Sequence, residues 1–241
     1  MNRPLPNFNQ PLYKSLPLPC PYISEEKERR IFTALEGPDA RLLYDLLIHA
    51  GFRRSHNIVY KPACSDCGKC LSLRVLVRDF SPSRSQKRIL SRNQDLKINL
   101  CPAIATKEQH DLFLRYMAAR HKNGEMSEMS WDSYREMIEG SSVQTQIIEL
   151  RDDKSDLLGA CLTDFLADGL SAVYSFFDPD LPRRSLGTFM VLRLLEEAKR
   201  RGLLHVYLGF WIRECRKMSY KTQFTPSEIF IGDSWQDFVP A

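Results

Sequence analysis

The chain has 241 residues, of which 43% are hydrophobic and 27% are charged, and its formal net charge is +4. This length and composition suit a globular protein of one or two domains with a full hydrophobic core, and they exclude a disordered or fibrous chain. No apolar run is long enough to span a bilayer, and the first 20 residues lack the unbroken apolar core of a signal peptide. We therefore expect a cytoplasmic protein without a membrane partner.

The small net charge hides two basic segments. Residues 53–92 contain ten basic and two acidic residues, and residues 183–221 contain ten and three, whereas the remainder of the chain is acidic. Basic segments in an otherwise acidic chain predict a local site for a polyanion rather than a generally basic surface.

The first third of the chain predicts an arm, two helices and two strands. Residues 1–19 contain five prolines and little periodicity, which indicates an extended arm. Residues 24–35 predict a helix with Ser24 as its N-cap. Residues 57–60 and 71–77 predict strands. Residues 39–51 predict a second helix whose apolar face comprises Leu42, Leu43, Leu46, Leu47 and Ala50.

Three cysteines lie in the loop KPACSDCGKC between the two strands. Cys64, Cys67 and Cys70 have CxxCxxC spacing, which lets several thiolates converge on one metal, and Cys20 is the candidate fourth ligand. Zinc and an iron–sulfur cluster both fit this spacing. An odd number of cysteines without an export signal favours a reducing compartment over disulfides, and three free thiols are the alternative to a metal site.

A short basic helix is predicted after the second strand. Ser83 or Ser85 can cap it, and it carries Lys87, Arg88 and Arg92. Serine and arginine together suit phosphate oxygens. The alternative is a solvated linker.

The second half predicts an ordered series of elements after a domain boundary at residue 100. A strand at 97–100 precedes helices at 106–121 and 131–139, and strands follow at 143–150, 157–165 and 170–177. Arg183, Arg184 and Gly187 then lead into a helix that ends at Gly202, and a buried strand follows at 203–210. Exposed N–H groups at such a helix start attract anions, so the loop predicts a phosphate or carboxylate site; a plain loop with solvated arginines is the alternative.

This order resembles the GNAT acyltransferase fold. The resemblance implies an α+β protein in which a GNAT-like domain, residues 101–241, has a mixed, mostly antiparallel sheet with flanking helices. A smaller α/β domain with the cysteine loop, residues 1–100, precedes it. In GNAT proteins the Arg-and-Gly loop usually holds the pyrophosphate of acyl-CoA, but Phe189 stands here at a small-residue position of that pattern.

Four motifs point to a narrower family: YKPACSDCGKC, FSPSRSQKR, YSFFDPDLPRRSLGTF and VYLGFWIRECRKMSYKTQFTPSE. Together they resemble the arginyl-tRNA–protein transferase family, and the length and CxxCxxC resemble its short bacterial branch of aspartate/glutamate leucyltransferases. The resemblance implies transfer of an amino acid, leucine in that branch, from its tRNA to the N-terminal amine of proteins that begin with Asp or Glu, which marks them for degradation by the N-end rule pathway. It implies no cofactor for the transfer itself. Eukaryotic relatives have an iron–sulfur site with another cysteine pattern, onto which only Cys20 and Cys67 map.

Such a reaction needs positioning of the amine and the ester, an unprotonated amine and stabilisation of an oxyanion. For proton removal we consider a Tyr–water relay, Asp178 or His121. The expected catalytic residues are Tyr174, Asp178 and Tyr220. The expected tRNA-binding residues are Arg183, Arg184, Gly187, Trp211, Lys217 and Lys221. The expected acceptor-binding residues are Lys61, Arg78, Arg84 and Arg88.

Two other classes remain open from sequence: a GNAT enzyme that uses acyl-CoA, and a non-catalytic RNA-binding protein with a zinc loop. Leucine and arginine also remain open as the donor.

Overall fold

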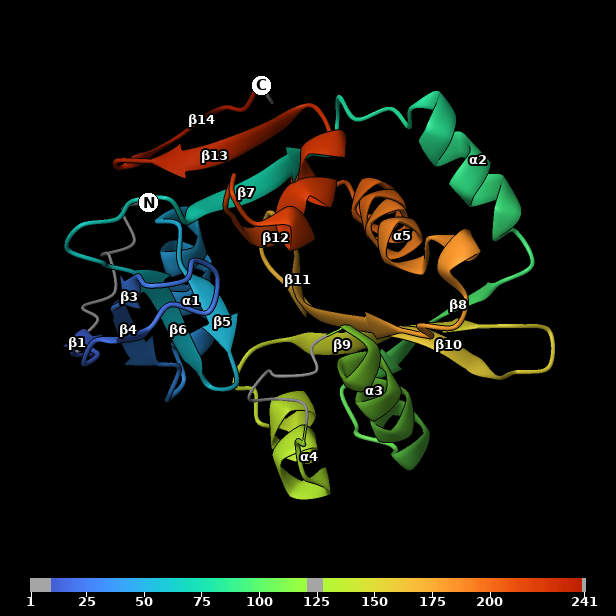
Figure 1. The fold of residues 1–241 in the computed structure, drawn as a ribbon, viewed down its shortest axis with the longest axis horizontal. Coiled ribbons are helices and arrows are strands. Elements are labelled where there is room, and N and C mark those ends of the chain that lie inside the picture. Colours follow the sequence, from blue (N-terminus) through green and yellow to red (C-terminus); the bar gives the residue numbers. More distant parts are fainter. Residues whose placement is uncertain (1–9, 121–127, 240–241) are drawn as a thin grey trace.

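The computed structural model describes residues 10–120 and 128–239, so His121 lies outside the described residues. Its strands form sheets of eight, four and two strands (Figure 1). No helix in the described ranges is long and apolar enough to cross a bilayer. The elements are β1 (Tyr13–Lys14), β2 (Leu18–Pro19), β3 (Lys27–Glu28), β4 (Arg30–Ala34), α1 (Ala40–His49), β5 (Arg53–Ser55), β6 (Ile58–Pro62), β7 (Leu71–Leu76), α2 (Arg84–Arg92), β8 (Lys97–Pro102), α3 (Lys107–Arg120), α4 (Trp131–Glu139), β9 (Thr145–Arg151), β10 (Leu157–Phe165), β11 (Gly169–Phe177), η1 (Pro182–Arg184), α5 (Leu186–Arg200), β12 (His205–Trp211), η2 (Arg216–Gln223), β13 (Ser227–Ile231) and β14 (Ser234–Asp237).

The eight-stranded sheet has the order β14-β13-β7-β12-β11-β10-β9-β8, and β11–β12 is its one parallel pair. Both faces of the sheet are covered, because α5 and α2 lie on one side and α3 and α4 on the other (Figure 1). All nine residues of β10 are buried. Its successive side chains alternate between two cores: Leu157 packs with α3 and α4, and Leu158 packs with α5.

The predicted α+β fold with a mixed, mostly antiparallel sheet and flanking helices is confirmed. The helix at 131–139 and the strand at 157–165 have the predicted bounds. Ser83 caps α2 through a reciprocal capping box with Gln86, because each side chain accepts a hydrogen bond from the other residue's backbone N–H.

The predicted helix at 24–35 is wrong. This stretch forms β3 and β4, and β4 pairs with β1 and β6, with Phe32 opposite Tyr60. Ile31, Phe32 and Thr33 are β-branched or aromatic residues that favour a strand when neighbouring strands are available. The pairing partners decide the outcome over a weak local helical pattern.

The helix predicted at 39–51 is confirmed as α1, but its predicted apolar face is partly wrong. Leu42 and Leu46 are 43% and 46% exposed, whereas Leu43, Tyr44 and Ile48 are buried. The helix is rotated so that Tyr44, a larger side chain, enters the core.

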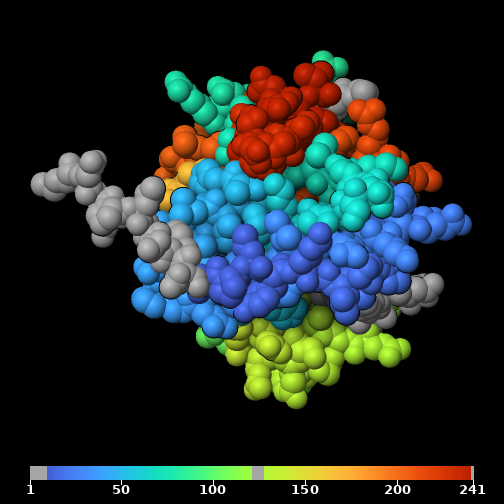
Figure 2. Space-filling model, turned by 90° about the vertical axis from the view of Figure 1, so that its left-hand side faces the viewer, coloured from blue at the N-terminus to red at the C-terminus, as the bar shows by residue number. Residues whose placement is uncertain are grey.

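The N-terminal unit consists of α1 and the sheet β1-β4-β6-β5. Figure 2 shows these segments, in blue and cyan, between the C-terminal hairpin in red and α4 in lime. The domain boundary at residue 100 stays a prediction, but strand pairing crosses it. β7 lies before residue 100, β8 extends across it, and both strands belong to the eight-stranded sheet. In that sheet β7 pairs with β12 and β13.

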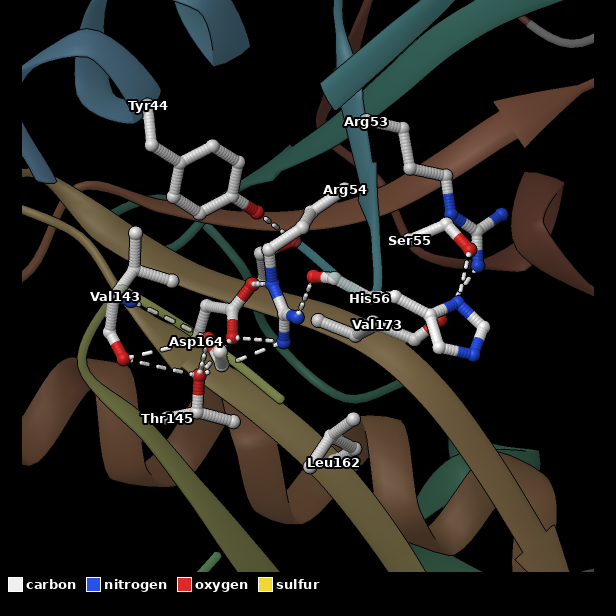
Figure 3. A network of polar contacts seen from close by, with 12 residues as sticks. Tyr44, Arg53, Arg54, Ser55, His56, Val143, Thr145, Leu162, Asp164 and Val173 are labelled. Carbon is white, nitrogen blue, oxygen red and sulfur yellow. Dashed lines mark hydrogen bonds and ion pairs between the residues drawn. The ribbon is translucent and has the colours of Figure 1, made fainter. Parts of the chain in front are cut away.

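A buried ion pair fixes the N-terminal unit to the large sheet (Figure 3). Nε and Nη2 of Arg54, on β5, each lie 2.7 Å from a carboxylate oxygen of Asp164 on β10, and both side chains are fully buried. Arg54 also donates to the carbonyl of His56, and Asp164 accepts from the hydroxyl of Thr145. The network therefore satisfies both charges, as burial of an ion pair requires.

A second polar contact involves Asp168, after β10. Its Oδ2 lies 2.7 Å from His205 Nδ1, 2.9 Å from the Tyr207 hydroxyl and 3.0 Å from Nε2 of His49 on α1. Burial alone would raise the pKa of Asp168, but these hydrogen bonds hold it well below its usual range. Asp168 therefore stays charged and links α1 to β12.

We expect Arg54→Ala to lower the free energy of unfolding by about 3–5 kcal/mol, because it leaves the Asp164 carboxylate buried without its partner. Urea denaturation of the variant and the wild type measures this loss. Arg54→Met combined with Asp164→Leu recovers much of it, since no unpaired charge then remains. The matched control is Arg135→Ala, which removes an exposed pair on α4 and should leave the midpoint unchanged. Equal midpoints for Arg54→Ala and the wild type would contradict the anchoring role.

Candidate active site

The parallel strands β11 and β12 separate shortly after they meet. They pair only from Gly169 to Ser171 against His205 to Tyr207. Beyond Tyr207, β12 has a register shift against β7, and Gly209 there has a φ of +71°. Irregular strands of this kind free backbone groups from the sheet and commonly border functional sites.

A cavity of about 180 Å³ lies at this opening. Side chains from five helical or strand elements besides β11 and β12 converge on it, which is the usual arrangement of a binding site. It is lined by Arg53, Tyr116, Cys161, Ala172, Val173, Tyr174, Ser175, Met190, Val191, Leu194, Leu208, Tyr220 and Lys221. A hollow of about 370 Å³ elsewhere is lined by residues of α4 alone, so it brings no separate elements together.

Two cationic side chains donate hydrogen bonds to backbone carbonyl groups near the point where the strands separate. Arg53 Nη2 donates to the carbonyl of Val173 on β11 at 2.6 Å, and Lys221 Nζ donates to the carbonyl of Phe210 on β12. Lys221 is only 5% exposed. Burial, and then the charge of Arg53, lowers the pKa of Lys221 to about 7. Near neutral pH this amine therefore exchanges between its charged and neutral forms.

Two of the expected catalytic residues, Tyr174 and Tyr220, line the cavity. Burial raises the pKa of Tyr174 well above its usual range, and the pKa of Tyr220, a residue that is 39% exposed, is also raised. Both hydroxyls stay protonated at neutral pH and are donors rather than bases. The Tyr174 hydroxyl lies 3.3 Å from the sulfur of Met117, a weak acceptor that a substrate oxygen can replace.

The structure places Asp178 and Trp211 outside the cavity. Asp178 lies 3.4 Å from Arg115 and accepts a hydrogen bond from the backbone of Asp180, so it shapes the turn after β11. Trp211 is 8% exposed and packs against Phe238, with the ring centroids 4.7 Å apart. In this conformation its ring belongs to the core and offers little surface for stacking with a base.

The predicted anion loop forms η1 and the start of α5. Arg183 is exposed, whereas Arg184 binds the carboxylate of Asp95 and the side-chain oxygen of Asn93. Ser185 has a left-handed φ of +53° and gives no side-chain cap, so N–H groups at the start of α5 are not capped by it. Arg183 and the helix start thus suit an anion more directly than Arg184 does.

Gly187 packs closely against Phe177. A Cβ on this residue would lie 2.8 Å from Cε1 of Phe177. Gly187→Val would therefore displace the Phe177 ring.

The expected acceptor-binding residues do not form one cluster. Lys61 lies on β6, donates to the carbonyl of Ala50 and covers the ring of Phe230, whereas Arg84 and Arg88 lie on the exposed side of α2. β6 and α2 are at opposite ends of the molecule in Figure 1. Arg78 is exposed in the segment between β7 and α2.

Lys217, one of the expected tRNA-binding residues, lies on η2 and donates to the carbonyl of Arg120 at 3.3 Å.

The four cysteines of the predicted metal site share one locality. Burial, and then the neighbouring thiolates of Cys20, Cys64 and Cys67, raises the pKa of Cys70 to about 12. A protonated thiol is a poor nucleophile. However, no group of three or more His, Cys, Asp or Glu side chains in the described ranges is arranged to hold a metal ion. The thiols suit zinc or an iron–sulfur cluster chemically, and the metal site stays a prediction.

Arg53 is the cavity residue that sequence reasoning missed. It was counted only within the basic segment 53–92. No local signal distinguishes it from Arg54, because their roles depend on Val173 and Asp164, more than a hundred positions away.

Most of the chain is similar in sequence to members of one protein family. The model "Arginine-tRNA-protein transferase, N terminus" matches residues 18–88, and "Arginine-tRNA-protein transferase, C terminus" matches residues 108–231. An aspartate/glutamate leucyltransferase of Paramagnetospirillum magneticum is 52% identical, with 95% of this chain and 93% of that protein covered. The protein of the same name from Granulibacter bethesdensis is 45% identical, with 98% and 90% covered.

Among solved structures, the C-terminal domain of a putative lysylphosphatidylglycerol synthetase from Agrobacterium fabrum is similar over 75% of this chain and 54% of that one. Its TM-score of 0.45 and identity of 14% are too low to carry a conclusion. The two family models and the two close relatives suffice: the chain belongs to the arginine-tRNA-protein transferase family.

Proposed function

We propose that this protein transfers leucine from leucyl-tRNA to the N-terminal amine of proteins that begin with Asp or Glu. The observation that carries this proposal is the high identity, over nearly full length, to relatives named aspartate/glutamate leucyltransferase. We further propose that the added leucine marks the acceptor for degradation by the N-end rule pathway. The reaction takes place in the cytoplasm, where charged tRNA is available.

The cavity offers what this reaction requires. An aminoacyl ester is already activated, so the protein has to position it, accept a proton and stabilise an oxyanion. Lys221 is a buried amine that is partly neutral near pH 7, and Tyr174 and Tyr220 are hydroxyl donors at the same cavity. No cavity residue in the described part of the chain carries a carboxylate or an imidazole, so Lys221 is the best base that this site provides.

In the mechanism that we propose, neutral Lys221 takes one proton from the α-ammonium group of the acceptor. The freed amine attacks the ester carbonyl carbon, and the tyrosine hydroxyls donate to the resulting oxyanion. The intermediate collapses as the bond to the ribose oxygen breaks. That oxygen leaves with the second proton of the attacking nitrogen, and Lys221 releases its proton to water.

The direct test is incubation of the protein with leucyl-tRNA and a peptide that begins with Asp. We expect mass spectrometry to show a peptide with one added leucyl residue at its N-terminus. Parallel reactions contain arginyl-tRNA or acetyl-CoA instead. Addition of arginine or of an acetyl group in place of leucine would replace the proposed donor, and tRNA binding without any transfer would favour the non-catalytic alternative.

We expect kcat/KM to rise as the pH increases through about 7, because a base must be neutral to accept a proton and the cavity lowers the pKa of Lys221 to about 7. Lys221→Met should lower kcat/KM by about 100-fold or more. The profile of the variant should keep only the titration of the acceptor amine itself, whose pKa is about 8. A variant that keeps the inflection near pH 7 and the wild-type rate would contradict the role of Lys221.

The exposed cations of α2 provide a separate test. Arg84 and Arg88 are exposed and have no ion-pair partner in the described ranges. If they bind the acceptor, Arg84→Ala and Arg88→Ala raise KM for Asp-starting peptides and leave tRNA binding intact. If they bind phosphates, each variant lowers the salt slope of tRNA binding by about one unit per lost contact. Lys154→Ala, in an exposed turn, is the matched control, and wild-type behaviour of both arginine variants would exclude both roles.

A further inference from the structure

Arg53 and Arg54 are consecutive residues of β5 with contrasting surroundings (Figure 3). Successive side chains of a strand point to opposite sides. Arg54 enters the core and binds the two oxygens of Asp164 through its guanidinium fork. Arg53 points to the cavity, where it donates a hydrogen bond to the carbonyl of Val173. In the described part of the chain, no ion pair supplies Arg53 with a carboxylate.

The cavity is a cationic site without a counter-charge of its own. Besides Arg53, the lining includes Lys221, whereas none of its described residues has a carboxylate side chain. The proximity of the two cations is evident because the charge of Arg53 contributes to the lowered pKa of Lys221. Buried charges in proteins are normally paired, so the missing anion is expected from a ligand.

The size of the cavity limits that anion to a small group. Its volume of about 180 Å³ is below the range of about 300–1,000 Å³ typical of pockets for larger ligands. Apolar side chains such as Met190, Leu194 and Leu208 line the remainder. A short side chain with a terminal carboxylate matches both the volume and the charge better than a nucleotide does.

We propose that the guanidinium of Arg53 binds the side-chain carboxylate of the acceptor's N-terminal Asp or Glu, and that Arg53 thereby determines the preference for acidic N-termini. This inference rests on the proposed function, from which the acidic acceptor follows. Arg53 keeps its charge at every accessible pH, and its planar fork matches a carboxylate in two-point contact. The pair formed by Arg54 and Asp164 is an example of this contact in the same protein.

The test compares matched peptides that begin with Asp and Asn, or with Glu and Gln, in the wild type, Arg53→Gln and Arg53→Lys. We expect Arg53→Gln to lower kcat/KM for the acidic peptides by about 100-fold or more, as is typical when one partner of a buried charge pair is removed, while the amide peptides change little. Arg53→Lys should keep part of the preference, because it retains the charge but loses the two-point contact. Arg200→Gln, at the exposed end of α5, is the control and should keep the wild-type ratio.

Three results would overturn the inference: an unchanged Asp-to-Asn ratio in a folded Arg53→Gln, an equal loss for both peptides, or a changed choice of donor amino acid with the acceptor preference intact. Thermal unfolding and tRNA binding verify that each variant is folded. If Arg53→Gln does not fold, the test uses Arg53→Lys instead. A wild-type Asp-to-Asn ratio of kcat/KM in Arg53→Lys then rejects the inference. Failure of the wild type to transfer leucine at all would instead reject the proposed function.

Discussion

The buried ion pair between Arg54 and Asp164 is the constraint on which the candidate site depends. It joins β5 of the N-terminal unit to the fully buried strand β10, and both charges have no exposed surface. Because Arg53 precedes Arg54 on the same short strand, fixing one guanidinium in the core also fixes the other at the cavity. The contact between His49 and Asp168 gives the same unit a second charged connection, to the end of β10. The N-terminal unit therefore contributes Arg53 to the candidate site, and its position follows from charges that have to be paired.

The separation of β11 from β12 opens the cavity that Arg53 lines. A continuous parallel pair would use its backbone groups within the sheet and leave no cavity. Here the pairing ends at Ser171, and the carbonyl groups of Val173 and Phe210 accept hydrogen bonds from Arg53 and Lys221 instead. The same separation brings an amine of lowered pKa next to hydroxyl donors. One irregularity in the sheet thus accounts for the cavity and for the two buried cations that line it.

Sequence alone determined the family and many of the elements. Hydrophobic periodicity gave the helix at 131–139 and the strand at 157–165 with their bounds. Sequence offered Ser83 or Ser85 as the cap of the basic helix, and the structure shows Ser83 in that role. Such features depend on residues within one turn or strand, so neighbouring letters contain the information. The stretch at 24–35 shows the limit, since its pairing with β1 and β6 outweighs a weak helical pattern.

Only the tertiary structure decided which chemical groups meet. Tyr174, Tyr220 and Lys221 converge on one cavity, whereas Asp178 lies outside it and Trp211 is in the core. Arg53 and Arg54 are indistinguishable in sequence, and only partners more than a hundred positions away make one structural and leave the other facing the cavity. The physical reason is that burial and long-range pairing set both the charge state and the direction of a side chain, and neither is encoded by its neighbours along the chain.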